Sequence, residues 1–421
     1  MPPLLRDPQH SPVVPHRSEG GAVVNDAAPD VFASLWLAVT GDVVPVRPLS
    51  AADARLRALL RSADLAVGNL ETPLTTATAR ADKAATLRAH PDRVAEVTAL
   101  GFDLVTLANN HHLDYGVEGM RDTRAALRAA GVDAVGSGET AAEALRTVVR
   151  STRAGDVAVI GLCSALPPGF AATEDRPGIA PLRVLQQVSI DPSIAAEQPG
   201  AAPYVHTQAY APDLEAACAE IRRVRDEVTL VVVAVHWGVP HGFAATSYGV
   251  LAEYQRPAAH RLVDSGADLV VGHHPHVVHP IERYGDGLIA YSIGNYLFHG
   301  WSSLSGAARA DGPIAGQPFP LQIPAAPYQN PFGSAANEES VVLVVELPDP
   351  GSGRLTVDFV PTVMVDGEPV LPGPERAAAV LQRLVEPALP TWDHGATPAL
   401  AHCSDLVPGT TVGRVSVERR R

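Results

Sequence analysis

Short apolar runs alternate with amphipathic segments along the chain from about residue 34 onward. Each run is rich in β-branched residues and ends in polar residues, and the segment after it has apolar positions at helical spacing. This alternation is typical of α/β folds. The predicted strands are Leu35–Thr40, Asp64–Val67, Asp103–Leu107, Val157–Leu162, Thr229–Val235, Leu269–Val271 and Leu288–Ile293. The predicted helices are Ala51–Ser62, Pro91–Leu100, Val117–Ala130, Asp213–Glu227 and Gly249–Asp264.

Two segments rich in proline, alanine and glycine interrupt this pattern, at about 164–212 and 301–337. Both exceed ordinary loop lengths, so each is either a lid or a disordered insertion. Two later strands, Ser340–Leu347 and Arg354–Met364, flank a turn-prone PDPGSG sequence. The predicted organisation is a flexible segment 1–33, a core 34–300 with the first insertion, a loop 301–337, strands 338–370 that complete a sandwich, and a helix and tail 371–421.

Charge and composition exclude several classes of function. The 421 residues include 32 Lys and Arg against 46 Asp and Glu, a net charge of -14, so the basic field that nucleic-acid binding needs is missing. Lys83 is the single lysine, a bias that we attribute to genome base composition rather than to chemistry. The three cysteines form no CxxC pair, and neither a secretory signal nor a membrane span is evident. We therefore expect a soluble cytoplasmic protein.

Polar side chains that can bind metals follow five of the predicted strands. They are Asp42, Glu71, the segment Asn109–Asp114, His236, and the sequence Gly272-His273-His274-Pro275-His276. Ligands of open α/β sheets collect at the carboxyl ends of the strands, so these side chains are expected to converge. Any one of them has a simpler explanation: Asp42 could cap a helix, and His236 could be a hydrogen-bonded core residue. Three imidazoles within four residues, however, are a poor choice for packing.

The types of ligand indicate which metal is expected. Mixed carboxylate, amide and imidazole groups suit Mn, Fe or Zn better than they suit calcium or magnesium. No cysteine lies in the cluster, which disfavours a structural zinc site. One or two divalent ions are expected.

The ordered motifs resemble those of the CapA family of poly-gamma-glutamate capsule synthesis proteins, which is similar to the calcineurin-like metallophosphatases. The matching motifs are Gly41-Asp42, GNLE at 68–71, ANNH at 108–111 with DYG at 114–116, HWG at 236–238, GHHPHV at 272–277 and YSIGNY at 291–296. The resemblance covers residues 35–300 and implies an α/β fold, a four-layer α/β/β/α sandwich of the metallophosphatase type.

The resemblance also implies roles for individual residues. The implied metal ligands are Asp42, Glu71, Asn110, His236, His273, His274 and His276. His111 is the implied acid, and Asp114 orients it by accepting the second ring proton. We assign Asn69, Asn109 and Asn295, which lie in the same motifs, to substrate binding.

The chain departs from the metallophosphatase pattern at three places. Val44 stands where that superfamily has a histidine, and Glu71 replaces the bridging aspartate. The closing motif has an extra histidine, which leaves His273 and His274 as alternative ligands beside His276. The number of ions therefore stays open at one or two.

The expected function is a metal-dependent hydrolase with phosphoesterase-type chemistry and metal-activated water, acting on a small or oligomeric anionic substrate. Two alternatives stay open. The chain could cleave glutamyl or other amide bonds, or it could be a non-catalytic metallophosphatase-like scaffold in polymer or metabolite biosynthesis. The sequence does not indicate an oligomeric state.

Overall fold

The computed structural model of the protein describes residues 34–419 except for residue 84 and the segments 199–203, 240–250, 300–334, 349–352, 387–400, 404–405 and 408–409. The predicted segment 1–33, nearly all of the predicted loop 301–337, the centre of the PDPGSG turn and the first two residues of the predicted helix at 249–264 lie outside the described residues.

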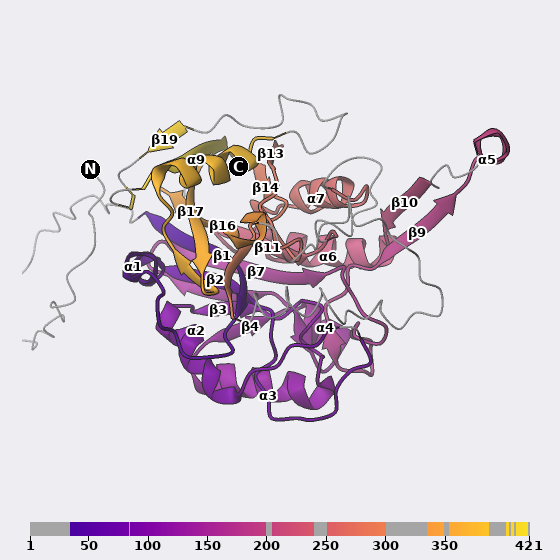
Figure 1. The fold of residues 1–421 in the computed structure, drawn as a ribbon, viewed down its shortest axis with the longest axis horizontal. Coiled ribbons are helices and arrows are strands. Elements are labelled where there is room, and N and C mark those ends of the chain that lie inside the picture. The colour runs from indigo at the N-terminus through magenta and orange to yellow at the C-terminus, as the bar shows by residue number, and fades with distance from the viewer. Residues whose placement is uncertain are drawn as a thin grey trace, which may run out of the picture.

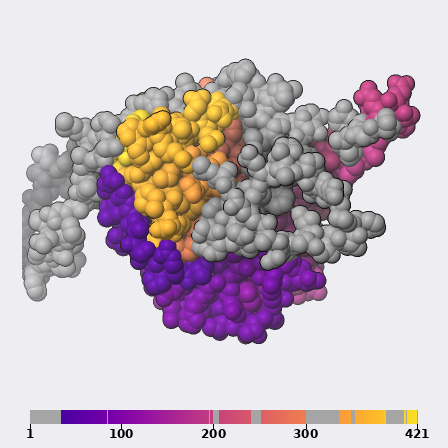
Figure 2. Space-filling model, viewed as in Figure 1, coloured from indigo at the N-terminus to yellow at the C-terminus, as the bar shows by residue number. Residues whose placement is uncertain are grey.

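Two large sheets form the centre of the molecule. The ten-stranded sheet has the order β19-β20-β17-β16-β1-β2-β3-β4, with β15 beside β1 and β18 beside β17. Its strands are β1 (Leu35–Val44), β2 (Leu65–Leu70), β3 (Leu104–Thr106), β4 (Asp133–Val135), β15 (Asn295–Phe298), β16 (Glu339–Leu347), β17 (Arg354–Val365), β18 (Glu368–Val370), β19 (Ala401–Cys403) and β20 (Val412–Glu418). In Figure 2 the yellow C-terminal residues lie beside the indigo N-terminal ones, because β16 pairs with β1 and β17 with β16.

The six-stranded sheet has the order β13-β14-β12-β11-β7-β6. Its strands are β6 (Val148–Thr152), β7 (Gly155–Cys163), β11 (Leu230–His236), β12 (Leu269–His273), β13 (Ile281–Tyr284) and β14 (Gly287–Ala290). β7, β11 and β12 are parallel, as are β1, β2 and β3 in the other sheet. Because of this, the strands that precede the candidate ligands have their carboxyl ends at the same edge of their sheet.

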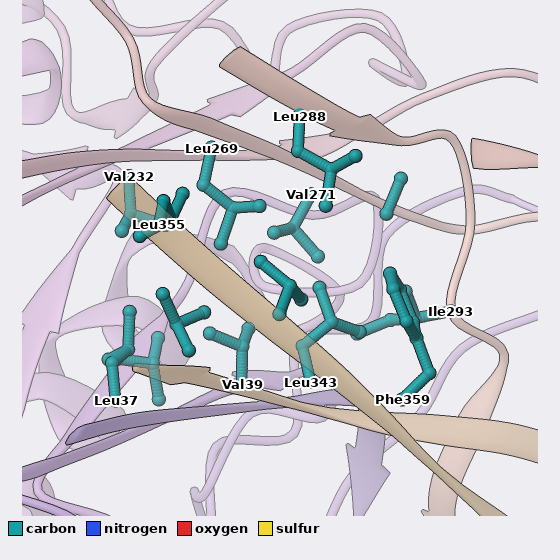
Figure 3. Close-up of a cluster of buried hydrophobic side chains, with 14 of the residues drawn as sticks. Leu37, Val39, Val232, Leu269, Val271, Leu288, Ile293, Leu343, Leu355 and Phe359 are labelled. Atoms are coloured by element: carbon teal, nitrogen blue, oxygen red, sulfur yellow. The ribbon is translucent and has the colours of Figure 1, made fainter. Parts of the chain in front are cut away.

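Alternation along the strands produces four layers. Leu230 and Val232 of β11 pack into the core between the two sheets, while Val231 and Val233 pack under helices. Figure 3 shows the inner core, where Leu343 of one sheet lies near Val271 of the other. Side chains on both faces of β11 are apolar and buried, as expected of a parallel strand that is covered on both sides.

Helices cover the outer faces of both sheets, as Figure 1 shows. α1 (Ala54–Ser62), α2 (Val94–Leu100) and α3 (Gly116–Ala129) pack on the ten-stranded sheet, and α6 (Ala211–Arg225) and α7 (Gln255–Asp264) pack on the six-stranded sheet. The predicted α/β/β/α sandwich is therefore confirmed. The remaining helices of the described residues are η1 (Pro91–Arg93), α4 (Ala141–Leu145), α5 (Pro192–Glu197), η2 (Ala335–Glu338) and α9 (Pro374–Arg383).

The insertion at 164–212 carries more regular structure than its composition predicts. It contains β8 (Gly178–Ile179), which pairs with β5 (Ser137–Gly138), and the antiparallel pair β9 (Val184–Ser189) and β10 (Tyr204–Ala209). β9, β10 and α5 project from the body of the molecule (Figure 1). Among the helices of the described residues, none has the length and apolar character needed to cross a bilayer.

Candidate metal centre

Glycines at the strand ends let neighbouring segments approach the candidate ligands. A Cβ atom at Gly41, just before Asp42, would lie 2.0 Å from the carbonyl oxygen of Gly294. That turn precedes Asn295, and the backbone N–H of Asp42 donates to the same oxygen at 3.1 Å. Glycine at this position therefore brings the YSIGNY motif against the end of β1.

Asp42, Glu71 and His276 form a first group whose ligand atoms all lie within 4.8 Å of one another. His276 Nδ1 is 3.2 Å from Asp42 Oδ2, and His276 Nε2 is 3.8 Å from Glu71 Oε1. All three side chains are buried. His276 has a φ of 57°, an unusual left-handed backbone conformation for histidine that aims its ring at the carboxylates.

Glu71, His236 and His274 form a second group, which shares Glu71 with the first. His236 Nε2 lies 3.5 Å from Glu71 Oε1 and 2.9 Å from Asn110 Oδ1. The His236 and His274 rings are 4.7 Å apart between centroids, and His274 also has a positive φ, of 95°. A carboxylate between two sets of imidazoles is an arrangement that suits a bridging ligand.

The electrostatics of the two groups fit divalent cations. Both carboxylate oxygens of Glu71 are buried without a hydrogen-bond partner. Burial, together with the nearby charge of Asp42, raises the pKa of Glu71 well above its usual value. Burial opposes a charge on His276, but Glu71 and Asp42 outweigh it and raise the pKa of His276 to about 9. Positive charge is therefore favoured between these carboxylates, and a buried carboxylate without partners is the group that a metal ion would satisfy.

The remaining imidazoles favour the neutral form that binds metals. Burial, and then the neighbouring histidines, hold the pKa of His236 well below its usual value. Burial likewise lowers the pKa of His274 to about 3. Neutral imidazole is the metal-binding form of histidine, so these residues suit the ligand positions of the second group.

His273 differs from the other two histidines of its motif. Its Nε2 lies 3.1 Å from the carbonyl oxygen of Thr40, so this ring atom is directed at the backbone of β1. Neither of the two ligand groups includes His273. The structure thus brings His274 and His276 together with Glu71 and directs His273 to the neighbouring sheet.

His111 and Asp114 lie beside the second group. His111 Nδ1 is 2.7 Å from Asp114 Oδ2, and the His111 side chain is 11% exposed while that of Asp114 is fully buried. An ionised carboxylate only accepts hydrogen bonds, so Nδ1 carries the proton and Nε2 stays available for another partner. This is the geometry expected of a histidine that a carboxylate orients.

The three asparagines assigned to substrate binding contact the candidate ligands or one another. Asn69 Nδ2 donates to Asp42 Oδ1 at 2.7 Å, and Asn109 Nδ2 donates to Asn69 Oδ1 at 3.1 Å. Asn295 Oδ1 lies 2.9 Å from His276 Nδ1. All three are fully buried. Their positions suit orientation of the ligands, and the contact with substrate stays a prediction.

Sequence reasoning missed one residue of the centre. Lys83 Nζ donates to the carbonyl oxygen of Asn110 at 2.6 Å and to Asp114 Oδ1 at 2.7 Å. The one feature of the sequence that could have indicated Lys83 is that it is the single lysine, and base composition alone is enough to explain that feature.

Comparison with known proteins places these motifs in a family. The model of the bacterial capsule synthesis protein family PGA_cap matches residues 36–300. The chain is 30% identical over 248 residues to the PGA biosynthesis protein CapA of Bacillus subtilis, covering 58% of this chain and 56% of that protein. It is 32% identical over 258 residues to the capsule biosynthesis protein CapA of Bacillus anthracis, covering 59% and 54%. The chain thus spans about half the length of the curated relatives that it matches.

Among solved structures, the chain is similar to a calcineurin-like phosphoesterase from Bacillus subtilis. The TM-score is 0.33 at 15% identity, and the match covers 80% of this chain and 88% of that one.

Proposed function

The chain belongs to the bacterial capsule synthesis protein family PGA_cap, and from the buried carboxylate and imidazole groups described above we propose that it is a metal-dependent hydrolase of phosphoesters. The observation that carries the proposal is Glu71, a fully buried carboxylate with no hydrogen-bond partner, shared by two groups of ligand atoms. Burying such a charge without a compensating cation is costly. A shared carboxylate supports two ions rather than one.

The proposed ligands follow from the two groups. Asp42, Glu71 and His276 would hold one ion, and Glu71, Asn110, His236 and His274 the other. Val44, which replaces a histidine of the metallophosphatase pattern, leaves the first ion with three protein ligands. Three protein ligands leave positions open to water and substrate, as catalytic sites require. Mn, Fe or Zn at such a site polarises an ester oxygen and makes water more acidic.

His111 is the proposed general acid. Asp114 holds Nδ1, which leaves Nε2 to face a leaving group. The acid form is the imidazolium, with protons on both Nδ1 and Nε2, which the site must maintain against the burial that lowers the pKa of His111. As water adds to phosphorus and the ester bond breaks, the leaving oxygen takes the Nε2 proton, which leaves the neutral ring with its proton on Nδ1, and a proton released by the water restores the imidazolium. Asn69, Asn109 and Asn295 keep the ligands oriented through buried hydrogen bonds.

Measuring bound metal and hydrolysis together tests this proposal. We expect about two ions of Mn, Zn or Fe per chain after loading, and hydrolysis of p-nitrophenyl phosphate or its diester. His236→Ala should lower the metal content from about two ions to about one per chain and the rate at least about 100-fold, because it removes a ligand of the second group. His206→Ala, a change of a partly exposed histidine on β10, is the matched control. A chain that binds no metal under any loading condition rules the proposal out.

A second candidate is hydrolysis of glutamyl amides. It is favoured by one observation, the similarity of the chain to a PGA biosynthesis protein of Bacillus subtilis. Offering γ-glutamyl-p-nitroanilide beside the phosphoesters separates the two. Release of nitroaniline without release of nitrophenol would favour the amide reaction, and metal binding with neither product would favour a scaffold.

A further inference from the structure

Lys83 is chemically distinct from every other basic residue of the chain, because the other 31 are arginines. Its side chain is 16% exposed. Its ammonium lies within 3.3 Å of three groups of the centre: the carbonyl oxygen of Asn110, Asp114 Oδ1 and His111 Nδ1. The single lysine is thus placed at the acid pair and at the backbone of a candidate ligand.

Two of these groups, the Asn110 carbonyl oxygen and Asp114 Oδ1, accept hydrogen bonds from the one nitrogen atom, while His111 Nδ1 carries its own proton toward Asp114 and is a close neighbour of the ammonium. An ammonium is a compact donor with three hydrogens that can meet acceptors around a point, whereas a guanidinium is a planar fork. An arginine at this position would have to place several nitrogen atoms where the structure places one. This geometry gives a chemical reason why a lysine stands at position 83, whereas the other 31 of the 32 Lys and Arg residues are arginines.

The described residues of segment 80–87, which include Lys83 and are called the strap below, form hydrogen bonds to the loop that carries His111. Ala81 N donates to the carbonyl oxygen of Asp114 at 2.8 Å, and Leu87 N donates to Asp114 Oδ2 at 2.6 Å. Asp114 Oδ2 is therefore shared between Leu87 and His111, while Lys83 holds Oδ1. Both carboxylate oxygens are held in place by the strap.

We propose that Lys83 is a positioning residue for the proposed general acid: its ammonium holds Asp114 and the Asn110 backbone, so that the His111 ring is fixed with Nδ1 on the carboxylate and Nε2 free for the leaving oxygen. This inference rests on the hydrolase function proposed above. Lys83 acts through Asp114 and His111, without contact with the metal ligand atoms.

Dependence on the leaving group distinguishes this role from general support of the fold. An acid helps a poor leaving group far more than a good one. Lys83→Met should therefore lower kcat for phenyl phosphate about 10- to 100-fold, and for p-nitrophenyl phosphate less than about 3-fold, with KM and bound metal unchanged. Arg80→Met, on the same strap, is the matched control and should behave like the wild type.

Two further variants show whether Lys83 and His111 act as a unit. Lys83→Met combined with His111→Ala should be no slower than His111→Ala alone, because both changes remove the same function. Lys83→Arg should be as slow as Lys83→Met. Lys83→Cys treated with 2-bromoethylamine restores a compact ammonium and should recover at least about half of the wild-type rate, with treated wild type as control. Additive effects, or equal losses on both esters together with lost metal, overturn the proposal.

A measurement without turnover keeps this inference separate from the proposed function. Lys83 is the only ε-amine of the chain, so reductive methylation followed by mass spectrometry reports on it alone, with the α-amine as internal reference. Methylation of Lys83 should be slow in the wild type and at least about 10-fold faster in Asp114→Asn. If no ester is hydrolysed but this acceleration is found, the hydrolase proposal fails while the contact stands. Equal rates in both proteins overturn the role of Lys83.

Discussion

At the scale of single residues, the candidate centre depends on small residues as much as on its ligands. Gly272 lies directly before the three histidines of the GHHPH motif, under the hydrogen bond from Trp237 Nε1 to the carbonyl oxygen of Tyr291, which is 2.8 Å long. A Cβ atom at Gly272 would lie 1.9 Å from that oxygen and 2.4 Å from Trp237 Nε1. The glycine is therefore required by the backbone and the buried indole that cross above it.

Gly272→Ala should lower the free energy of unfolding by about 3 kcal/mol, because neither the backbone nor the buried indole can move without further cost. Urea unfolding in the presence of a chelator measures this without a contribution from bound metal. Gly373→Ala is the matched control, since a Cβ atom there meets nothing within 4 Å. The control should cost less than about 1 kcal/mol. Equal losses in the two variants would contradict the packing argument.

At the scale of elements, sequence periodicity located helices and strands well and located their ends less well. The helix predicted at 117–130 is α3, at Gly116–Ala129, and the strand predicted at Thr229–Val235 is β11, at Leu230–His236. β1, predicted to end at Thr40, continues to Val44, because it pairs with β15 beyond the point where its apolar run ends. The strands β8, β9 and β10 were missed, since their proline-, alanine- and glycine-rich context hides them.

A buried carboxylate fixes α7 to the six-stranded sheet. Glu282 of β13 accepts hydrogen bonds from Arg256 Nη2 at 2.8 Å and from Tyr291 at 2.6 Å, and its Oε1 lies 3.0 Å from His260 Nε2. Its side chain is 1% exposed. Burial opposes ionisation, but the hydrogen bonds from His260, Arg256 and Tyr291 outweigh it and lower the pKa of Glu282 to about 2.

This low pKa predicts a dependence of stability on pH. The pKa of Glu282 in the folded state lies below its usual value of 4.5, so its contribution is complete above that value and is lost as the pH falls toward about 2. The difference in unfolding free energy between wild type and Glu282→Gln should therefore shrink by about 2 kcal/mol between pH 5 and pH 3. Urea unfolding at several pH values measures it, with the exposed Glu118→Gln as control. A difference that does not change with pH would contradict this.

At the scale of the whole molecule, the candidate centre joins the two sheets. Asp42 and Glu71 come from the ends of β1 and β2 in the ten-stranded sheet. His236, His274 and His276 come from the ends of β11 and β12 in the six-stranded sheet. Each ligand group therefore takes atoms from both sheets. Metal binding should accordingly stabilise the sandwich as a whole rather than one local loop.

Metal should raise the thermal stability of the protein through this connection. At a free Mn²⁺ or Zn²⁺ concentration of about 100 times Kd, binding to the folded state alone contributes about 2.7 kcal/mol. Glu71→Gln should abolish the metal-induced rise in Tm, because it removes the charge shared by both groups. The same variant should not lower the Tm measured in chelator, since Glu71 is a buried carboxylate without hydrogen-bond partners. A full metal-induced rise in Glu71→Gln would exclude Glu71 as a ligand.

Local periodicity was enough to establish the α/β class, the central parallel strands with their longer helices, and the strand ends at which polar residues gather, because these features depend on residues close together in the chain. The family motifs extended this to the four layers. Which atoms meet depends on how two sheets face each other, and no local pattern contains that information. The positive φ angles of His274 and His276, the turning of His273 toward Thr40, and the approach of Lys83 to His111 across 28 residues all arise from that packing.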